Sequence, residues 1–240
     1  MPFWRAAVML FGHVRRWGAL ALLVLWLCVG PTGPALAALD APGGEPPPGG
    51  QPGGMAAPPD VPLAVLLTHD DLEATFGGRL PETRGRWVEQ SFFSPALGRE
   101  TTYLAWLPPG YASSESAYPT LYLLHGVGGA AGVGPEEWLG YALTETLERM
   151  LALRLLEPMI VVLPQGEQSY WVNHADGGPR WADFVAVDLV ADVDATFRTA
   201  PTREARAVGG LSMGGHGALQ LAYNFADTFS VAGAHSPSLR

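Results

Sequence analysis

The sequence predicts an α/β fold, a mostly parallel sheet with helices on both faces. Residues 120–124 and 159–163 are continuous apolar runs, which are typical of strands buried on both faces of a sheet. Segments with apolar residues at helical spacing separate these runs from each other and from a later strand–turn–helix pattern. Strands that alternate with helices usually pair in parallel, so this order favours one sheet between two helical layers.

A hairpin is expected at the start of the sheet. Residues 86–93 and 101–107 alternate or run apolar, and the turn residues 94–98 separate them, which predicts two antiparallel strands. The segment 108–111, Pro-Pro-Gly-Tyr, ends the second strand before the buried strand at 120–124.

Two amphipathic helices are expected to cover the sheet. They span 136–155 and 183–197, and each carries apolar residues along one side. A short capped helix is also expected near His69, ahead of the hairpin. The remaining elements follow the same alternation and are, in order, a strand at 205–209, a helix at 214–223 and a final strand at 229–234.

The chain divides into three parts by composition. Residues 1–37 indicate a secretory signal peptide, with basic residues, an apolar stretch too short for a comfortable membrane span, and a small-residue cleavage site. An uncleaved membrane anchor is the alternative interpretation. Residues 38–60 are mostly Pro and Gly and predict a disordered linker, and residues 61–240 are expected to form one domain.

Charge and cysteine content argue against several classes of function. The formal net charge is −9, and residues 1–37 contain Arg but no acid, so the remainder is more acidic still. No nucleic-acid partner is expected, because nucleic-acid binding needs a basic surface. The single cysteine, Cys28, lies in the predicted signal peptide, so the mature chain is expected to have no disulfide. No metal or other cofactor is expected, because no cluster of His or acidic residues has metal-ligand spacing.

A serine lies at the centre of the motif Gly210-Leu211-Ser212-Met213-Gly214. The residues before it predict a strand and those after it a helix rich in small residues, which is the context of a nucleophile elbow. Such a turn strains the backbone at the serine, so its neighbours must be small. The free N–H groups at the helix start favour negative charge beside the serine. We interpret Ser212 as a nucleophile; a plain Gly-rich loop before a packed helix is the alternative.

A second glycine loop, His125-Gly126-Val127-Gly128-Gly129, follows the strand at 120–124. Acyl transfer needs two convergent N–H donors for the negative oxygen of the tetrahedral intermediate. The N–H of Met213 can supply one. Val127, with Gly126 next, is the best candidate for the other, because loops at the carboxyl ends of neighbouring parallel strands converge. An ordinary strand-to-helix loop is the alternative.

Several further motifs accompany the two glycine loops in a fixed order. They are residues 91–111, Trp138, residues 161–166, Tyr170-Trp171-Val172-Asn173 and Arg180-Trp181. Over about residues 88–237 this order resembles the esterase family of α/β-hydrolases that includes esterase D, feruloyl esterases and mycobacterial mycolyltransferases. The resemblance implies an α/β-hydrolase that cleaves carboxylic esters, with Ser212 as nucleophile and the N–H groups of Val127 and Met213 as oxyanion hole.

Candidate substrate contacts surround the predicted oxyanion hole. They are His125, Gly126, Trp171, Asn173 and His235. Tyr170, Trp171 and Trp181 could present aromatic surface to a sugar or aryl ester, although aromatic residues in such loops are as often packed inside.

The triad of this family is completed by an acid and a His after the nucleophile. After Ser212 the chain offers only Asp227, His216 and His235. His216 is expected to be structural, Asp227 to lie at the side of the sheet away from the elbow, and His235 to contact substrate rather than act as base. We therefore expect a chain that is incomplete at its C-terminus, lacking the last strands, the triad acid and the triad His. Expressed alone, it is expected to be poorly soluble and inactive, since the strand at 229–234 would be an open edge.

The predicted function is a secreted or envelope-associated serine esterase that forms an acyl-enzyme on Ser212. Its expected substrate is a small-molecule or carbohydrate-linked ester, and no stable membrane partner is expected after signal cleavage. An acyltransferase would use the same acyl-enzyme with an alcohol as acceptor. A non-catalytic fragment that retains the fold is the third hypothesis. A downstream acid and His would support an enzyme.

Overall fold

The computed structural model of the chain describes residues 84–128 and 134–238. The predicted signal peptide at 1–37, the linker at 38–60 and the short helix near His69 lie outside the described residues.

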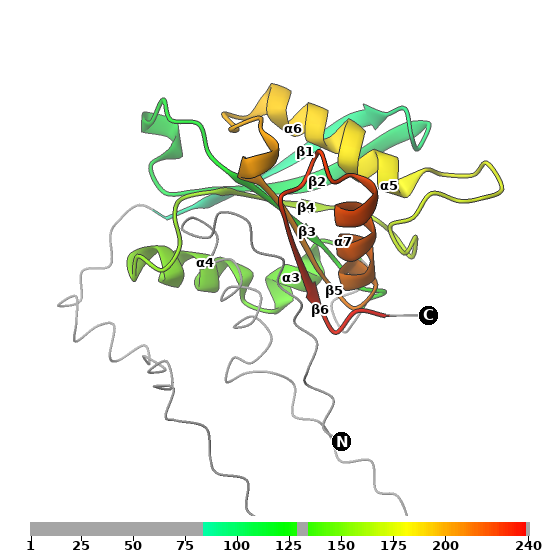
Figure 1. The fold of residues 1–240 in the computed structure, drawn as a ribbon. Coiled ribbons are helices and arrows are strands. Elements are labelled where there is room, and N and C mark those ends of the chain that lie inside the picture. The colour runs from blue at the N-terminus through cyan, green and yellow to red at the C-terminus, as the bar shows by residue number, and fades with distance from the viewer. Residues whose placement is uncertain (1–83, 129–133, 239–240) are drawn as a thin grey trace, which may run out of the picture. The chain divides into compact units, whose positions relative to one another are not determined.

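Within the described residues, six strands form one sheet in the order β1-β2-β4-β3-β5-β6 (Figure 1). Strand β1 pairs antiparallel with β2, and β2 pairs antiparallel with β4, whereas the pairs β4–β3, β3–β5 and β5–β6 are parallel. The expected mostly parallel sheet with an antiparallel hairpin is confirmed. The strands are β1 (Arg86–Ser94), β2 (Arg99–Leu107), β3 (Thr120–Leu124), β4 (Ile160–Pro164), β5 (Arg206–Leu211) and β6 (Val231–His235).

Helices cover both faces of this sheet, as expected (Figure 1). One face is covered by α3 (Glu136–Gly140) and α4 (Leu143–Ala152). The other face carries the continuous helical run α5 (Trp181–Asp183), η2 (Phe184–Leu189) and α6 (Val190–Thr196), together with α7 (Met213–Asn224). Two short turns, η1 (Tyr111–Ser113) and η3 (Arg203–Ala205), lie in the connections.

The two faces of β3 show how the core is divided. All five residues of β3 are buried. Leu121 and Leu123 pack with the apolar side chains of α3 and α4, and Tyr122 and Leu124 pack with those of the other helical layer. Side chains of a strand point alternately to opposite faces, so a strand covered on both faces must be apolar throughout. The continuous apolar run in the sequence has this physical origin.

The structure differs from the sequence prediction in both long helices. The helix expected over 136–155 is two helices, because Ala142 adopts a left-handed conformation with φ 57° between them. The helix expected over 183–197 begins at Trp181, and its segment Phe184–Leu189 is a π-helix. A single left-handed residue or one wider turn leaves the apolar pattern nearly unchanged, so periodicity could not reveal either feature.

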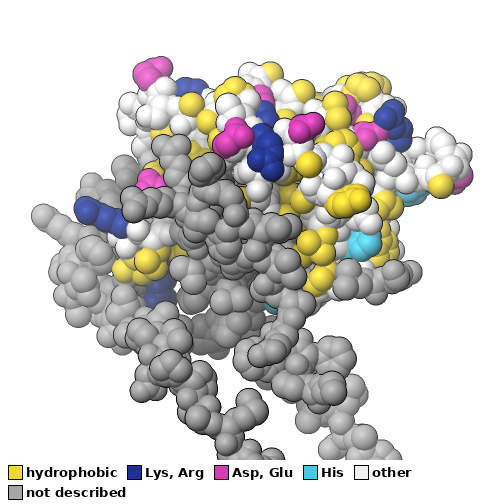
Figure 2. All heavy atoms as spheres, in the orientation of Figure 1, with side chains coloured by type: hydrophobic (Ala, Val, Ile, Leu, Met, Phe, Trp, Pro, Cys, Tyr) yellow, Lys and Arg dark blue, Asp and Glu magenta, His cyan; other side chains and the backbone are white. Residues whose placement is uncertain are grey.

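The outer face of α7 is apolar. Leu219 is 43% exposed and Tyr223 is 86% exposed. Hydrophobic side chains gather over α7 on the face that Figure 2 shows. Strand β6, next to α7, pairs only with β5 among the described strands. None of the described helices is both long and apolar enough to cross a membrane.

Candidate active site

Ser212 lies in the sharp turn between β5 and α7. Strand β5 ends at Leu211, α7 begins at Met213, and Ser212 between them has φ 54° and ψ −111°. The expected strand–turn–helix is therefore present, with the serine in a backbone conformation that L-residues rarely adopt. A residue held in such a conformation must be over-determined by the structure around it, and such strain is common at functional sites.

Two glycines make this turn possible. A Cβ atom added at Gly214 would lie 2.0 Å from the carbonyl oxygen of Leu124, and one at Gly210 would lie 2.1 Å from the carbonyl oxygen of Gly214. Both distances are far below van der Waals contact with rigid backbone. The first turn of α7 thus packs directly on the carboxyl end of β3, and the motif glycines are needed for that approach.

The backbone of Ser212 is held on both sides. Its N–H donates to the carbonyl oxygen of His235 (N···O 2.9 Å), and its carbonyl oxygen accepts from the amides of His216 and Ser238, both at 3.0 Å. The side chain is half-buried. The Ser212 hydroxyl has no hydrogen-bond partner among the described residues, and its position is set by the bonded backbone.

The glycine loop after β3 lies against this turn. The position of a Cβ on Gly126 would be 3.5 Å from the carbonyl oxygen of Leu211, the residue before the serine. The Gly126 N–H donates to the Glu137 carboxylate (N···O 2.5 Å), so it is not free for a substrate. The amides of Val127 and Met213 have no acceptor within the described ranges. Of the two donors considered for this loop, Val127 is thus the one left free.

His125 is placed differently from the substrate contact that the sequence suggested. Its side chain is fully buried. Its Nε2 accepts the Gly166 N–H at 2.9 Å, which leaves the proton on Nδ1, and Nδ1 lies 2.7 Å from the Gly126 carbonyl oxygen. Burial lowers the pKa of His125, so the ring is neutral. Because both of its ring nitrogens are hydrogen-bonded to backbone groups, His125 fixes the glycine loop after β3 from inside the protein. Gly126, buried with both backbone groups bonded, likewise has no polar group left for a substrate.

Trp171 is also a core residue rather than a substrate contact. It is fully buried, and its indole N–H donates to the carbonyl oxygen of His125 at 3.2 Å. A Cβ on Gly217 of α7 would lie 2.5 Å from the Trp171 side chain, so the indole is pressed against that helix. Tyr170 and Trp171 have φ 55° and 59°, which places two left-handed residues in succession in the loop after β4.

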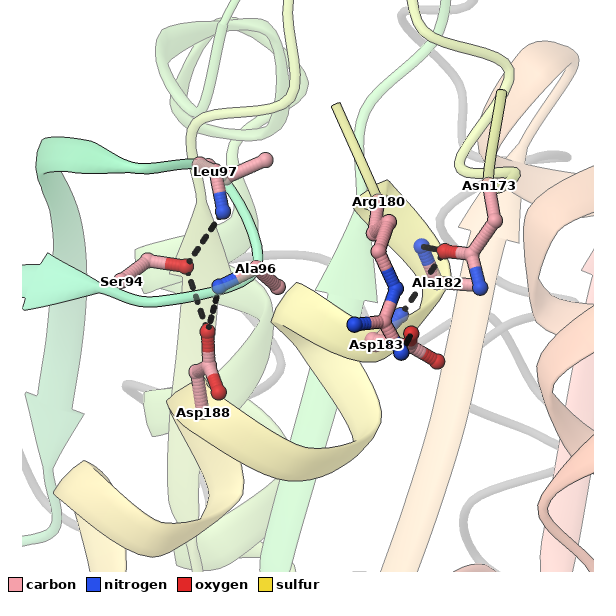
Figure 3. Close-up of polar contacts among 8 residues, drawn as sticks. All are labelled: Ser94, Ala96, Leu97, Asn173, Arg180, Ala182, Asp183 and Asp188. Carbon is pink, nitrogen blue, oxygen red and sulfur yellow. Dashed lines mark hydrogen bonds and ion pairs between the residues drawn. The ribbon is translucent and has the colours of Figure 1, made fainter. Parts of the chain in front are cut away.

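Asn173 is exposed, but its side chain serves the helix that follows. Its amide oxygen accepts the backbone N–H groups of Ala182 (3.0 Å) and Asp183 (3.2 Å), as Figure 3 shows. These are free amides at a helix start, which need acceptors. Trp181, which begins this helix, is 2% exposed and presents no aromatic surface. Trp181 therefore has a packing role, and Asn173 has a capping role through its amide oxygen, while substrate contact by Asn173 stays a prediction.

His235 keeps its place as a candidate contact. It ends β6 at the edge of the sheet where Ser212 lies, and it is half-buried. Its Nδ1 is buried without a hydrogen-bond partner in the described part of the chain. Desolvation lowers its pKa, so the ring is neutral near pH 7.

The other residues that follow Ser212 do not complete a triad. His216 is half-buried on α7 with its ring edge against Tyr170 (centroids 6.2 Å apart). Asp227 is exposed and precedes β6, at the end of the strand opposite His235. Among the described residues, no His or carboxylate is hydrogen-bonded to the Ser212 hydroxyl, and no group of three side chains could hold a metal ion.

Two features escaped the sequence analysis. Glu137 is buried, at 5% exposure, and accepts a hydrogen bond from the glycine loop after β3. Its position between Pro135 and Trp138 is the sequence signal that could have indicated its burial. A cavity of about 250 Å³ lies along the second half of α7, away from Ser212. It is lined by Trp171, Val172, Asn173, Ala182, Gln220, Asn224 and Phe225.

A mostly parallel sheet between two helical layers, with a serine at a strained strand-to-helix turn beside free amides, defines the α/β-hydrolase fold. Within that class, the chain belongs to the family described as "Putative esterase", whose model matches residues 94–240.

Proteins similar to this chain include several esterases. Esterase Rv1288 of Mycobacterium tuberculosis is 34% identical over 149 residues, which are 60% of this chain and 31% of that protein. An acetyl esterase of Caldicellulosiruptor saccharolyticus is 32% identical over 146 residues, 57% of this chain and 51% of that protein. A solved ferulic acid esterase superposes with a TM-score of 0.58 and 26% identity over 65% of this chain and 61% of that one. The matched region thus covers 31% of the first of these two curated relatives and 51% of the second.

Proposed function

We propose that the protein is a serine esterase that cleaves carboxylic esters through an acyl-enzyme on Ser212. The observation that carries the proposal is the conformation of Ser212, whose φ of 54° and ψ of −111° present a half-buried hydroxyl with no partner in the described residues. Membership of the esterase family supports the same reaction class.

The proposed chemistry follows from the groups around the hydroxyl. The Ser212 oxygen attacks the ester carbonyl, and the carbonyl oxygen takes up negative charge as the tetrahedral intermediate forms. The amides of Val127 and Met213 stabilise that charge, which is the largest single contribution in many such sites. The alcohol leaves, and water then attacks the acyl-enzyme to release the acid and restore the serine.

The serine must lose its proton for this reaction. No described His is bonded to its hydroxyl, so we propose that the triad His and acid come from outside the described residues. The proposed location is outside the cytoplasm, on the basis of the predicted signal peptide at 1–37. Because named relatives include an acetyl esterase and a ferulic acid esterase, acetyl and feruloyl esters are the first substrates to test.

Covalent labelling tests the proposal. The purified full-length protein is treated with a fluorophosphonate, and the modified peptide is identified by mass spectrometry. We expect label on Ser212, none on the Ser212→Ala variant, and unchanged labelling of Ser236→Ala, a neighbouring exposed serine. Hydrolysis of p-nitrophenyl acetate should fall by about 10³-fold or more in Ser212→Ala wherever turnover is measurable. A folded full-length wild-type protein that takes no label would contradict the proposal.

A further inference from the structure

The two peptide units that flank Gly126 are each held by one buried side chain, and the two side chains come from different parts of the chain. Glu137 accepts the Gly126 N–H at 2.5 Å, and the Nδ1–H of His125 donates to the Gly126 carbonyl oxygen at 2.7 Å. Glu137 is 5% exposed and His125 is fully buried. A loop glycine, whose backbone would otherwise be free to rotate, thus has both of its polar groups fixed inside the protein.

This arrangement also fixes the direction of the next amide. The peptide bond is planar and trans, so the Gly126 carbonyl and the Val127 N–H lie in one plane and point in opposite directions. No cis peptide bond occurs among the described residues. Because the His125 ring holds the carbonyl, the Val127 N–H must point away from that ring. It has no protein acceptor there within the described residues.

The His125 ring is itself locked. Its Nε2 accepts the Gly166 N–H at 2.9 Å, and its own carbonyl oxygen accepts the Trp171 indole N–H at 3.2 Å. The ring packs edge-on against Trp171, with centroids 5.0 Å apart. Burial lowers the pKa of His125, which favours the neutral ring, and the Gly166 N–H bond makes Nε2 the acceptor and Nδ1 the donor. The loop after β3 is therefore tied to the loop after β4 through one neutral imidazole.

Glu137 has no evident packing reason to lie inside the protein. Burying a carboxylate is costly unless it is hydrogen-bonded. The Gly126 amide is its hydrogen-bond partner among the described residues, and both carboxylate oxygens lie close to Gly126, at 3.1 Å and 3.3 Å from the position of a Cβ on that residue. The contact also engages the Gly126 N–H inside the protein, whereas the Val127 N–H has no acceptor among the described residues.

We infer that Glu137 and His125 are positioning residues that fix the two peptide units on either side of Gly126, Glu137 the one before it and His125 the one after it, so that the Val127 amide serves the oxyanion hole. This inference rests on the proposed esterase function. Neither side chain touches the ester; each acts through the peptide it holds. A donor that is slightly misplaced loses much of its effect on the transition state, because its stabilisation depends on prior alignment.

Three substitutions at Glu137 separate positioning from simple stabilisation. Glu137→Gln keeps an acceptor oxygen for the Gly126 N–H. Glu137→Met keeps a similar length without an acceptor, and Glu137→Asp keeps the charge but withdraws it by one methylene. Glu136→Gln is the matched control, since Glu136 is exposed on the same turn of α3. Thermal unfolding checks that each variant is folded.

The first readout is the second-order rate constant of fluorophosphonate labelling at Ser212, which requires an oriented oxyanion hole. We expect a fall of about 10-fold or more in Glu137→Met and Glu137→Asp, given the 10²–10³-fold that follows complete loss of one donor. Glu137→Gln and Glu136→Gln should remain within about 3-fold of the wild type. Where turnover of p-nitrophenyl acetate is measurable, the loss should appear in kcat and not in KM.

The second readout does not depend on activity. Hydrogen exchange of the Gly126 amide, measured by NMR, should speed up by about 10-fold or more in Glu137→Met and stay near the wild-type rate in Glu137→Gln. If the wild type takes no label, the proposed function fails, and amide exchange alone decides whether the Glu137 contact exists. If the wild type is labelled and the folded Glu137→Met variant is labelled equally fast, the inference is overturned while the function stands. If Glu137→Met does not fold, Glu137→Asp decides in the same way.

Discussion

The amide of Ser212 donates a hydrogen bond to the carbonyl oxygen of His235, with N and O 2.9 Å apart. Through this bond the end of β6 holds the strained turn between β5 and α7. The Ser238 amide, just beyond β6, adds a second bond to the Ser212 carbonyl oxygen at 3.0 Å. The conformation of Ser212 is thus held by the end of β6 and by the residues just beyond it, as a strained backbone requires.

Gly214→Ala should disrupt the fold at the elbow. A Cβ there would lie 2.0 Å from the Leu124 carbonyl oxygen, which is backbone of a central strand and cannot give way. Overpacking usually costs 1–3 kcal/mol and more where the obstacle is rigid, so we expect a loss of about 3 kcal/mol or more in the free energy of unfolding. Urea unfolding measures it. Leu219→Ala, at an exposed position of the same helix, should change the value by less than about 1 kcal/mol.

Acidification should destabilise the fold through His125. Burial lowers its pKa below the ordinary 6.5, so the unfolded chain binds a proton at a higher pH than the folded protein does. The stabilisation is complete above pH 6.5 and is lost as the pH falls below it, by at most about 1.4 kcal/mol per pH unit for one histidine. His235, whose pKa desolvation also lowers, contributes in the same direction.

Urea unfolding at pH 7.5, 6.5 and 5.5 measures this pH dependence. In His125→Gln the change in the free energy of unfolding across that range should be smaller than in the wild type. His174→Gln, which replaces an exposed loop histidine, should keep the wild-type dependence. An unaltered slope in His125→Gln would show that its titration is not coupled to folding.

Asp188 should stabilise the β1–β2 turn. Its Oδ2 accepts the Ser94 hydroxyl at 2.6 Å and the Ala96 amide at 2.8 Å, which joins the hairpin to the π-helical segment (Figure 3). Ser94 is fully buried, so Asp188→Ala leaves a buried donor without its partner. We expect a cost of about 1–3 kcal/mol by thermal or urea unfolding.

A double-mutant cycle checks the Asp188 assignment. The cost of Asp188→Ala and Ser94→Ala together should be smaller than the sum of the two single costs, since the variants share one contact. Asp227→Ala, at an exposed aspartate, should be nearly neutral. Strict additivity would place the effect of Asp188 elsewhere.

Asn173→Ala should weaken the start of the helix at Trp181. The side-chain oxygen of Asn173 accepts hydrogen bonds from two backbone amides there. Loss of such a cap typically lowers the free energy of unfolding by about 1 kcal/mol, within 0.5–2 kcal/mol. Asn173→Asp keeps an acceptor and should be close to the wild type. His174→Ala is the neighbouring control. Equal melting temperatures for Asn173→Ala and the wild type would contradict the capping role.

Most of the sheet could be predicted from the sequence. Strands β3 and β4 are continuous apolar runs because both of their faces are buried. Strands β1 and β2 alternate because only one of their faces is buried. The helix interruption at Ala142 and the π-helical segment could not be predicted from the sequence. Each depends on how a helix packs on the sheet, and each hardly alters the spacing of apolar residues.

The sharp turn at Ser212 was predictable, because close packing of the backbone there requires glycines. Gly210 and Gly214 are such glycines, and the glycine loop that carries Val127 gives a similar signal. The roles of the polar side chains were harder to predict from the sequence. A histidine in a glycine loop and an asparagine in a surface loop look like ligand contacts, yet His125 and Asn173 satisfy backbone groups instead. Which partner a polar side chain meets is a long-range property, and the sequence does not contain it locally.

The direct pairing of Leu124 with Gly210 has a kinetic consequence. These residues carry the two halves of the site, and the whole of β4 and most of the helices separate them in the chain. Bringing such distant segments together requires loop-closure entropy to be paid first, so their pairing is expected late in folding. A nascent or partly folded chain would then hold the elbow serine without its second amide donor. Under the proposed function, esterase chemistry would therefore begin only when the central strands had paired.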